Sequence, residues 1–346
     1  MVVGIDLGMT NTRACYFVNG QKRLLKFAGG MDMLPSVIYT EDGGKVIVGQ
    51  KALYKGQIEP SRMISLSEAY RRTSELNKLW KCGEQIFTAA GIAAEILREV
   101  RQRLIRNARL DENEDIGAVI AVPVYFDDNQ RNEIRRAGAA AGFKVMRILE
   151  KPTAAAIEAL HGRQLDKKIL VIDIGFSAFE LSVLDKNYTI IATDGNPIGG
   201  DDFDRAIQQE FIRRIEEDTG IKLTDAKSAG LDDAYYQSLM SQLLDEARNV
   251  KEFLSEVTEE TVTVMMPNLT TLGGQYYVYE SDFTRKDLER VCKPLFDKIF
   301  NRLNDFVNVE DIGHVILAGG TCSIPYIKER IERDLGIKPE EDLPLS

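Results

Sequence analysis

Residues 2–18 read VVGIDLGMTNTRACYFV, and residues 170–185 read LVIDIGFSAFELSVLD. Each segment contains an apolar strand pattern, an Asp-x-Gly sequence, a polar turn and a second run in which apolar residues alternate. This pattern predicts two strands joined by a short turn. Its repetition half a chain away predicts two related lobes.

Strand and helix patterns alternate around these hairpins. The segments GAVIAVP (117–123) and KVMRIL (144–149) flank a helical pattern at 127–141, which opens with Asp127 and Asp128, typical N-cap residues. A strand, a helix and a strand in this order predict a parallel pair in a sheet with two covered faces. Further helices are predicted at 91–106, 202–216 and 226–256, and further strands at 261–267, 275–280 and 314–318.

Composition limits the classes of partner. The 346 residues include 44 Lys and Arg against 54 Asp and Glu, a net charge of −10 that argues against nucleic acid or an anionic membrane as the main partner. The four cysteines show no CxxC spacing, and with two histidines a zinc site is not expected. The longest apolar stretch, AVIAVPVYF, is too short to span a bilayer. We therefore expect a soluble, cytoplasmic protein.

The two Asp-x-Gly turns are candidate metal and phosphate sites. Asp6 and Asp173 would each end a buried strand, and Gly8 and Gly175 would expose backbone N–H groups in the turn. Backbone amides can hold phosphate oxygens while a carboxylate orders the waters of a metal ion. Either turn alone could equally be an ordinary strand end, but the repetition favours function.

Two glycine pairs precede predicted helices: Gly199-Gly200 and Gly319-Gly320. A helix N-terminus with small residues can bind an anion or the polar edge of a nucleoside. Tight strand-to-helix turns are the alternative interpretation of both pairs.

Four segments together resemble a known family. They are IDLGMTNT (5–12), AVPVYFDDNQRNEIRRAGAAAGFKVMRILEKPTAAAIEAL (121–160), IGGDDFD (198–204) and LAGGTCSIPYIKE (317–329). Their order resembles the nucleotide-binding domain of the DnaK-type, 70-kDa heat-shock chaperones, in the actin-like ATPase superfamily. The resemblance implies an α/β fold of two lobes, each a mixed sheet flanked by helices with a smaller inserted subdomain. It also implies ATP or ADP and Mg²⁺ in a central cleft.

The resemblance carries expectations about domains and partners. Lobe I would span 1–163, with a small subdomain at about 35–112, and lobe II 164–346, with its core at 164–205 and 284–346 and an insertion at about 206–283. Partners would be nucleotide and proteins similar to co-chaperones or exchange factors. Because the sequence ends at KPEEDLPLS, no peptide-binding domain is expected in this chain.

The resemblance also implies site residues. Asp6 and Asp173 would order the waters of Mg²⁺, and the catalytic positions would be Asp6, Asp173, Lys151, Glu68 and Glu180. The phosphates would meet Gly8, Met9, Thr10, Asn11, Gly175 and Phe176. The other nucleotide contacts would be Gly199, Gly200, Asp201, Arg248, Lys251, Glu252, Ser255, Gly319, Gly320, Thr321 and Ser323.

Several of these residues depart from the family pattern. Met9 replaces a Thr, and GFSAFE (175–180) replaces Gly-Gly-Gly-Thr-Phe-Asp. If the glycine conformation had a positive φ, Phe176 would cost about 1–2 kcal/mol there, so the turn is expected to change shape. Glu252 and Ser323 stand where two arginines sandwich the adenine, which predicts weaker nucleotide binding.

Two charged positions are also altered. The catalytic lysine of the family aligns with Glu68, and the acid before the proline of its Asn-Glu-Pro-Thr motif aligns with Lys151. A carboxylate about 4 Å from a phosphate charge would cost roughly 4 kcal/mol at an effective dielectric near 20. Glu68 and Lys151 could form a swapped pair that balances this charge, or Lys151 could be a solvated residue of a degenerate site.

The sequence leaves three functions open. The first is an ATP-binding, chaperone-type domain with slow hydrolysis. The second is a pseudo-ATPase that acts as a protein-binding scaffold, and the third and weakest is a small-molecule kinase of the same superfamily.

Overall fold

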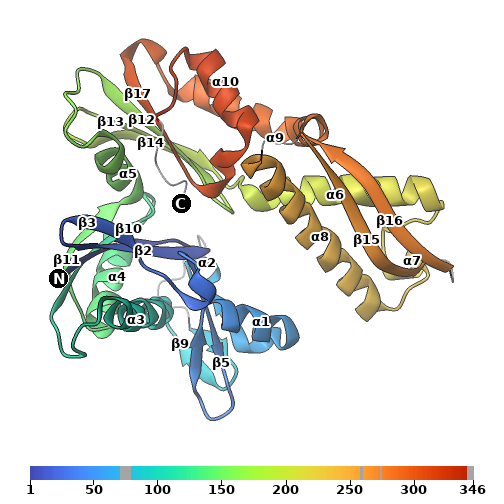
Figure 1. Ribbon diagram of the computed structural model, residues 1–346, viewed down its shortest axis with the longest axis horizontal. Helices are drawn as coiled ribbons and strands as arrows, with labels where there is room; N and C mark the ends of the chain where they lie inside the picture. Colours follow the sequence, from blue (N-terminus) through green and yellow to red (C-terminus); the bar gives the residue numbers. More distant parts are fainter. Residues whose placement is uncertain (71–78, 258–259, 273–274, 341–346) are drawn as a thin grey trace. The chain divides into compact units, whose positions relative to one another are not determined.

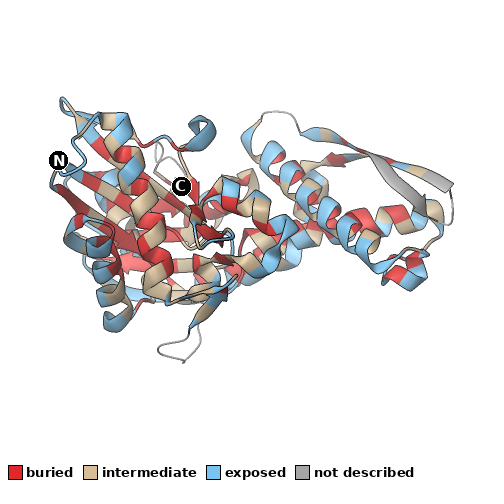
Figure 2. Cartoon of the chain, turned by 90° about the horizontal axis from the view of Figure 1, so that it is seen from below, coloured by how far each residue is buried: buried red, intermediate tan, exposed pale blue. Residues whose placement is uncertain are grey.

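The computed structural model describes residues 1–70, 79–257, 260–272 and 275–340. The chain forms two compact units, Met1–Ala154 and Ala155–Ser346 (Figure 1). In both units the buried residues follow the sheet strands and one face of each long helix (Figure 2). Within the described residues, no helix is both long and apolar enough to cross a membrane.

The main sheet of the first unit has the strand order β11-β10-β1-β2-β3, and the short β4 also pairs with β2. Strand β1 runs antiparallel to β2 and parallel to β10, which runs parallel to β11. The predicted parallel pair around the helix at 127–141 is therefore confirmed. The strands are β1 (Val2–Leu7), β2 (Asn11–Val18), β3 (Gln21–Leu24), β4 (Leu34–Pro35), β10 (Ile116–Val122) and β11 (Phe143–Glu150).

Two long helices cover this sheet. Helix α3 (Ala89–Ala108) buries apolar residues at the predicted four-residue spacing, from Ile92 to Leu104. Helix α4 (Asp128–Ala140) begins with a capping box, in which the Asp127 carboxylate accepts from the Gln130 N–H and the Gln130 side chain accepts from the Asp127 N–H. Helix α5 (Lys151–Leu160) follows β11 without an intervening residue.

A smaller part of the first unit contains a three-stranded sheet with β5 between β6 and β7, and a hairpin of β8 and β9. Val37, Tyr39, Ile47 and Ala52 form its own apolar cluster. Its elements are β5 (Val37–Thr40), β6 (Val46–Val48), α1 (Gln50–Ile58), η2 (Pro60–Arg62), β7 (Met63–Ser65), α2 (Leu66–Ala69), β8 (Trp80–Cys82) and β9 (Gln85–Phe87). The remaining short helix of this unit is η1 (Ala28–Gly30).

The sheet of the second unit repeats the central arrangement of the first. Its order is β14-β13-β12-β17, with β12 antiparallel to β13 and parallel to β17. Each sheet therefore has a central strand that ends in Asp-x-Gly, between an antiparallel hairpin partner and a parallel strand. The strands are β12 (Lys168–Ile174), β13 (Phe179–Leu184), β14 (Ile190–Asn196) and β17 (Ile312–Ala318).

The rest of the second unit consists of helices and one long hairpin. Phe203, Ile207, Phe211 and Ile215 of α6 are fully buried, as their spacing predicts. The elements are α6 (Gly200–Thr219), α7 (Ala226–Ala229), α8 (Asp233–Glu256), β15 (Thr261–Leu272), β16 (Gln275–Thr284), α9 (Arg285–Phe306), η3 (Val309–Asp311), η4 (Gly320–Ser323) and α10 (Pro325–Leu335).

The single helix predicted at 226–256 is wrong. Gly230 has a φ of +69° and ends α7, and the Asp232 carboxylate then accepts from the Tyr235 N–H to begin α8. A left-handed residue cannot continue a helix, so the chain forms a short helix and a long one.

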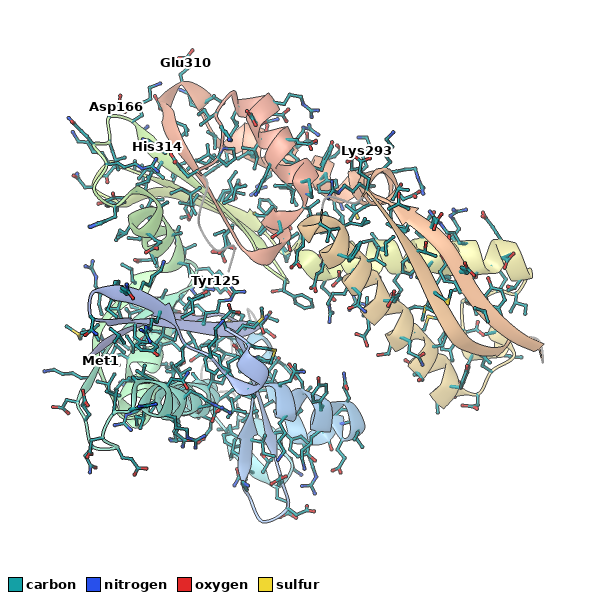
Figure 3. The ribbon with its side chains drawn as sticks, viewed as in Figure 1. Met1, Tyr125, Asp166, Lys293, Glu310 and His314 are labelled. Atoms are coloured by element: carbon teal, nitrogen blue, oxygen red, sulfur yellow. The ribbon has the colours of Figure 1, made fainter. Side chains whose placement is uncertain are left out.

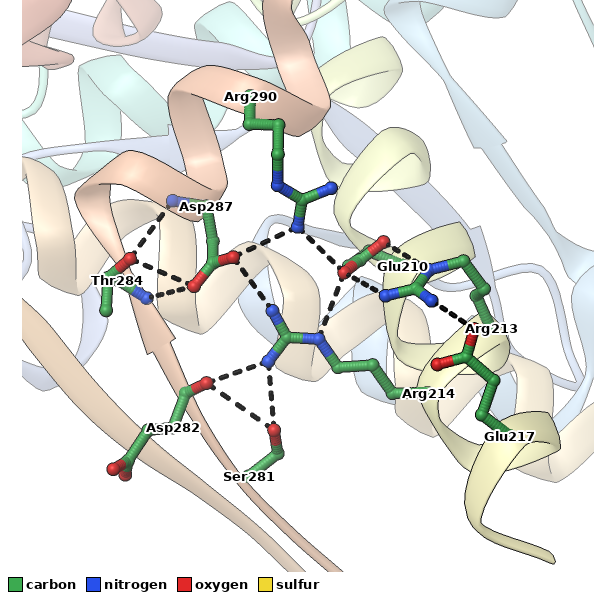
Figure 4. Close-up of polar contacts among 9 residues, drawn as sticks. All are labelled: Glu210, Arg213, Arg214, Glu217, Ser281, Asp282, Thr284, Asp287 and Arg290. Atoms are coloured by element: carbon green, nitrogen blue, oxygen red, sulfur yellow. Dashed lines mark hydrogen bonds and ion pairs between the residues drawn. The ribbon is translucent and has the colours of Figure 1, made fainter.

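A network of charged side chains joins α6, β16 and α9 (Figure 4). The Glu210 carboxylate is 6% exposed and accepts hydrogen bonds from Arg213, Arg214 and Arg290 at 2.8–3.0 Å. Arg214 also donates to the Asp282 carbonyl at 2.7 Å. The Arg213 hydrogen bond, followed by those of Arg290 and Arg214, outweighs desolvation and lowers the pKa of Glu210 to about 2.

The segment after α10 is fixed to β17 by Glu340. Its N–H donates to the Val315 carbonyl at 2.8 Å, and its carboxylate lies 2.8 Å from Nδ1 of His314, which Figure 3 labels. Arg163 donates to the same carboxylate at 2.6 Å. Burial alone would raise the pKa of Glu340, but the hydrogen bonds from His314 and Arg163 outweigh it and lower the pKa.

Candidate functional site

The turn after β1 is shaped so that only glycine fits at position 8. A Cβ added to Gly8 would lie 1.9 Å from the Asn11 carbonyl oxygen. The Gly8 N–H donates to the Asp6 carbonyl at 3.1 Å, which closes the turn between the two strands. The requirement for Gly8 is therefore steric, through the close approach of two backbone segments.

Ser36 stabilises this turn through two hydrogen bonds. It is fully buried; its hydroxyl donates to the Gly8 carbonyl at 2.6 Å, and its N–H donates to the Thr10 carbonyl at 2.7 Å. The Ser67 N–H donates to the Met9 carbonyl at 3.1 Å. Three successive carbonyl groups are thus bound by the protein, so the turn has its shape before any ligand arrives. The sequence carried no signal for Ser36, which lies 28 residues from Gly8.

Asp6 forms an ion pair with Lys151. The Lys151 Nζ lies 2.9 Å from Oδ1 of Asp6, and the two side chains are only 20% and 30% exposed. Lys151 is the first residue of α5, where the helix dipole disfavours a positive charge, so the nearby carboxylate stabilises it there. Lys151 is therefore not a solvated side chain at a helix start.

Glu68 lies on the four-residue helix α2, directly after Ser67, whose N–H donates to the Met9 carbonyl of the first turn. It is exposed, and its N–H donates to the Ser65 hydroxyl at 3.1 Å. Glu150, the residue before Lys151, pairs with Arg131 instead.

The turn after β12 packs directly against the start of α6. The Gly175 N–H donates to the Ala178 carbonyl at 2.9 Å. The Gly200 N–H donates to the Gly175 carbonyl at 2.9 Å, and the Asp201 N–H donates to the Phe176 carbonyl at 2.8 Å. The first amides of α6 are thus bound to the turn itself.

Gly199 and Thr321 complete this packing. A Cβ on Gly199 would lie 2.4 Å from the Phe176 carbonyl oxygen, so a side chain cannot be placed there without moving the turn. The Thr321 hydroxyl, which is buried, donates to the Gly175 carbonyl at 3.1 Å. The structure therefore brings Gly175, Phe176, Gly199, Gly200 and Thr321 together, as predicted site residues of one unit.

Phe176 occupies its position without left-handed strain. The described residues other than glycine that have a positive φ are Asn19, Arg109 and Tyr188. The Phe176 side chain is 37% exposed, and the Arg248 guanidinium carbon lies 5.3 Å from its ring centroid. The cost expected for a residue at positive φ does not arise, and the ring gains a cation–π contact.

Asp204 forms ion pairs with two basic residues close to the turn after β12. It is fully buried, with Lys251 Nζ 2.5 Å from Oδ1 and Arg248 Nε 3.1 Å from Oδ2. Lys251 is 7% exposed and also donates to the Gly200 carbonyl at 3.2 Å. The Ser255 hydroxyl donates to the Lys251 carbonyl at 2.6 Å. Asp204 was not among the predicted site residues, although it lies in the IGGDDFD segment.

Glu252 and Ser323 are the two positions where arginines are expected. Glu252 reaches the surface, yet the protein around it removes enough water to raise the pKa of its carboxyl group above the usual value. Ser323 is half-buried at the end of η4. Neither residue offers the flat cationic surface that stacks on a base.

The glycines after β17 differ from each other. Gly319 has a φ of +80°, and a Cβ on it would lie 2.5 Å from Oδ1 of Asp173. A Cβ on Gly320 would meet nothing within 4 Å. Of the six predicted site glycines, all in the described part of the chain, Gly320 is the one beside open space.

The two aspartates differ in how well they suit a magnesium ion. Asp173 lies opposite Glu180 across the β12–β13 ladder, where paired side chains share a face, and carboxylates are ligands that Mg²⁺ prefers. Asp6 lies opposite Arg13 and pairs with Lys151, so its charge is already balanced. The residues around Asp6 therefore do not fit a hydrated divalent cation. The described residues contain no group of three His, Cys, Asp or Glu that could hold a metal ion.

Comparison with known proteins agrees with this architecture. The family model described as Hsp70 protein matches residues 2–344. A chaperone protein dnaK of Emiliania huxleyi is 31% identical over 99% of this chain and 57% of its own length. The chloroplastic heat shock 70 kDa protein 6 of Arabidopsis thaliana is 31% identical over 98% of this chain and 49% of its own length. The chloroplastic stromal 70 kDa heat shock-related protein of Pisum sativum is 30% identical over 98% of this chain and 50% of its own length.

The chain spans about half the length of the curated relatives it matches. Its mixed sheets flanked by helices are those of the actin-like ATPase fold, as predicted. With a family model matched over nearly the whole sequence and relatives at about 31% identity, this chain belongs to the Hsp70 family.

Proposed function

We propose that this chain is an ATP- and ADP-binding domain of chaperone type in which hydrolysis is slow. The observation that carries the proposal is the repeated Asp-x-Gly turn at the same place in two sheets of matching strand arrangement. Backbone turns of this kind can hold phosphate oxygens, and the first is fixed in shape by Ser36. Family membership supports a nucleotide as the ligand.

We assign the phosphates to the segment Gly8–Asn11 and to Gly175. The nucleoside would contact Gly320, Ser323 and Glu252. Of these, Gly320 has open space beside it. Gly199, Gly200, Lys251, Ser255 and Thr321 would act mainly by holding the turn and α6 in place. For the domains, we propose lobe I at 1–163 and lobe II at 164–346, with the insertions given above.

Slow hydrolysis follows from the charges near the phosphate turns. Glu68 occupies the position of a catalytic lysine and brings a negative charge instead, and Lys151 takes the place of an acid. Neither residue can take over the role of the group that it replaces, because the sign of its charge is opposite. We therefore expect turnover well below that of a typical member of the family. We propose that the protein is located in the cytoplasm.

The alternative is a pseudo-ATPase that binds proteins as a scaffold. One observation favours it: the first amides of α6 donate to the Gly175 and Phe176 carbonyls, so protein groups already use donors that a nucleotide could have used. In either case a partner of the co-chaperone or exchange-factor type would recognise the conformation of the chain. Because the chain aligns with about half of each relative, we propose nucleotide binding and not the activity of the whole relative.

Isothermal titration with ATP and with ADP tests the proposal. Wild-type protein should bind both, and Gly320→Val should weaken binding by at least about tenfold, because it fills the open space beside η4. Ala192→Val is the matched control, since it adds two methyl groups to an exposed position of β14. Phosphate release then measures turnover. Failure of the wild type to bind either nucleotide at millimolar concentration would refute nucleotide binding and favour the scaffold.

A further inference from the structure

We propose that nucleotide binds to this chain without a divalent metal ion, because Lys151 supplies the positive charge beside Asp6. Asp173 and Glu180 remain as one pair of carboxylates in the second unit, and the described residues place no third His, Cys, Asp or Glu with them to complete a metal site. The inference rests on the nucleotide binding proposed above and specifies the form of the ligand as free ATP or ADP. Lys151 is then a specificity-determining residue that replaces the charge of the metal in the first unit.

The ammonium group of Lys151 occupies the position beside Asp6 that a metal ion would need. Lys151 Nζ lies 2.9 Å from Oδ1 of Asp6, within the distance of a close ion pair. A hydrated cation ordered by Asp6 would need the same carboxylate, and Mg²⁺ gives up its bound waters reluctantly. Two cations at one carboxylate repel each other, so the ammonium group excludes the metal from this position.

The backbone holds both residues of the pair in place. Asp6 lies on the central strand, paired with Ala121 of β10 on one side and Arg13 of β2 on the other. Lys151 follows Glu150 directly, and Glu150 is the partner of Val122 in the β10–β11 ladder. The pair therefore joins the ends of three adjacent parallel strands.

The neighbour before Lys151 is fixed as well. The Glu150 carboxylate pairs with Arg131, and Arg131 Nε donates to the Phe126 carbonyl at 2.9 Å. Glu150 is thus bound to Arg131 of α4, whereas Asp6 pairs with Lys151. The start of α5 keeps its place, and Lys151 is the side chain that it directs to the carboxylate.

Two basic residues lie beside Asp6 in the fold. Lys151 forms the ion pair with its carboxylate, and Arg13 is the residue opposite Asp6 in the β1–β2 ladder. An acid at position 151 would change the local charge by two units, which is the charge that a divalent ion carries. The substitution seen in this sequence therefore compensates for the metal in sign and in size.

The test compares nucleotide affinity in excess EDTA and in excess Mg²⁺, by titration calorimetry with ATP and ADP. Wild-type protein should show dissociation constants within about threefold of each other in the two buffers. Lys151→Glu should bind at least about tenfold more tightly with Mg²⁺ than without it, because two carboxylates then face the phosphate.

Lys168→Glu is the matched control. It makes the same charge reversal in an ion pair of β12, where Lys168 Nζ lies 3.0 Å from the exposed Asp311. Its affinity should stay as insensitive to Mg²⁺ as that of the wild type.

The wild-type comparison needs no variant, so the test survives even if Lys151→Glu does not fold. Tight binding only in Mg²⁺ would overturn the metal-independent mode and leave nucleotide binding intact. Absence of binding in both buffers would instead refute the proposed function. A Lys151→Glu protein that folds and binds equally in both buffers would also overturn the role of Lys151.

Discussion

Phe176 stands in the turn after β12, where the family resemblance predicts a small residue, and the structure gives its ring a partner. The Arg248 guanidinium carbon lies 5.3 Å from the ring centroid, and Arg248 is itself held by the buried Asp204. A cation above an aromatic face is attracted by the electron density of the ring. Phe176 thus belongs to the same charged cluster as Lys251, which the sequence assigned to the nucleotide.

A double-mutant cycle measures this contact. Phe176→Ala and Arg248→Ala should each destabilise the protein to urea, and the double variant should lose about 0.5–1 kcal/mol less than the sum of the two. The loss of the Arg248–Asp204 pair occurs in both backgrounds and cancels in the cycle. Phe176→Tyr, which keeps the aromatic face, should retain the coupling. Additive losses would show that the ring and the guanidinium group do not interact.

The residues of the candidate site fall into two groups, according to whether their contact partners are near or far from them in the sequence. Gly8, Gly175, Asp6 and Asp173 could be found from sequence, because each belongs to a short local pattern that appears twice. The contact of Ser36 with Gly8 spans 28 residues, and that of Asp204 with Lys251 joins two helices. No local pattern predicts such contacts, because they depend on how the elements pack.

At the scale of elements, periodicity and capping residues predicted well. The helix at 91–106 was found from its apolar spacing, and α4 begins at the Asp127 cap that the sequence indicated. The prediction failed at 226–256, although Gly230 and Asp232 are a typical helix end and a typical helix start. Charged residues on both sides of the break made one long pattern out of two helices.

Gly230 should therefore be sensitive to substitution. Gly230→Ala should lower the free energy of unfolding by about 1 kcal/mol, because the φ of +69° is unfavourable for a residue with a Cβ. Gly230→Asn should cost less, since Asn adopts left-handed conformations more readily. Urea unfolding followed by circular dichroism measures both. An Ala variant as stable as the wild type, with added helical signal, would mean that α7 and α8 join into the single helix first predicted.

At the scale of the whole molecule, the C-terminal unit depends on one buried carboxylate to bind three elements together. Glu210 of α6 accepts from Arg213 and Arg214 of its own helix and from Arg290 of α9, and Arg214 continues to β16 (Figure 4). The side chain is 6% exposed, so its ion pairs are poorly screened by solvent. This network links the helices to the long hairpin.

The pKa of Glu210, about 2 against an ordinary value of 4.5, makes this network dependent on pH. Since the pKa is lower in the folded state, its contribution is complete above pH 4.5 and is lost as the pH falls from about 4.5 to about 2. The difference of roughly 2.5 units corresponds to about 3 kcal/mol of stability at neutral pH. Glu210→Gln should remove most of this contribution and flatten the stability curve in that range.

Glu217→Gln is the control, because Glu217 pairs with Arg213 at an exposed position and should matter by less than about 1 kcal/mol. Amide hydrogen exchange of α6 and α9 at pH 7 reports the opening of this part of the chain directly. Faster exchange in both helices for Glu210→Gln, with little change for Glu217→Gln, is the expected result. If the wild type and Glu210→Gln lost stability equally between pH 4.5 and 2, other carboxylates would account for the acid sensitivity. In that case Glu210 would serve only to position Arg214 against the hairpin.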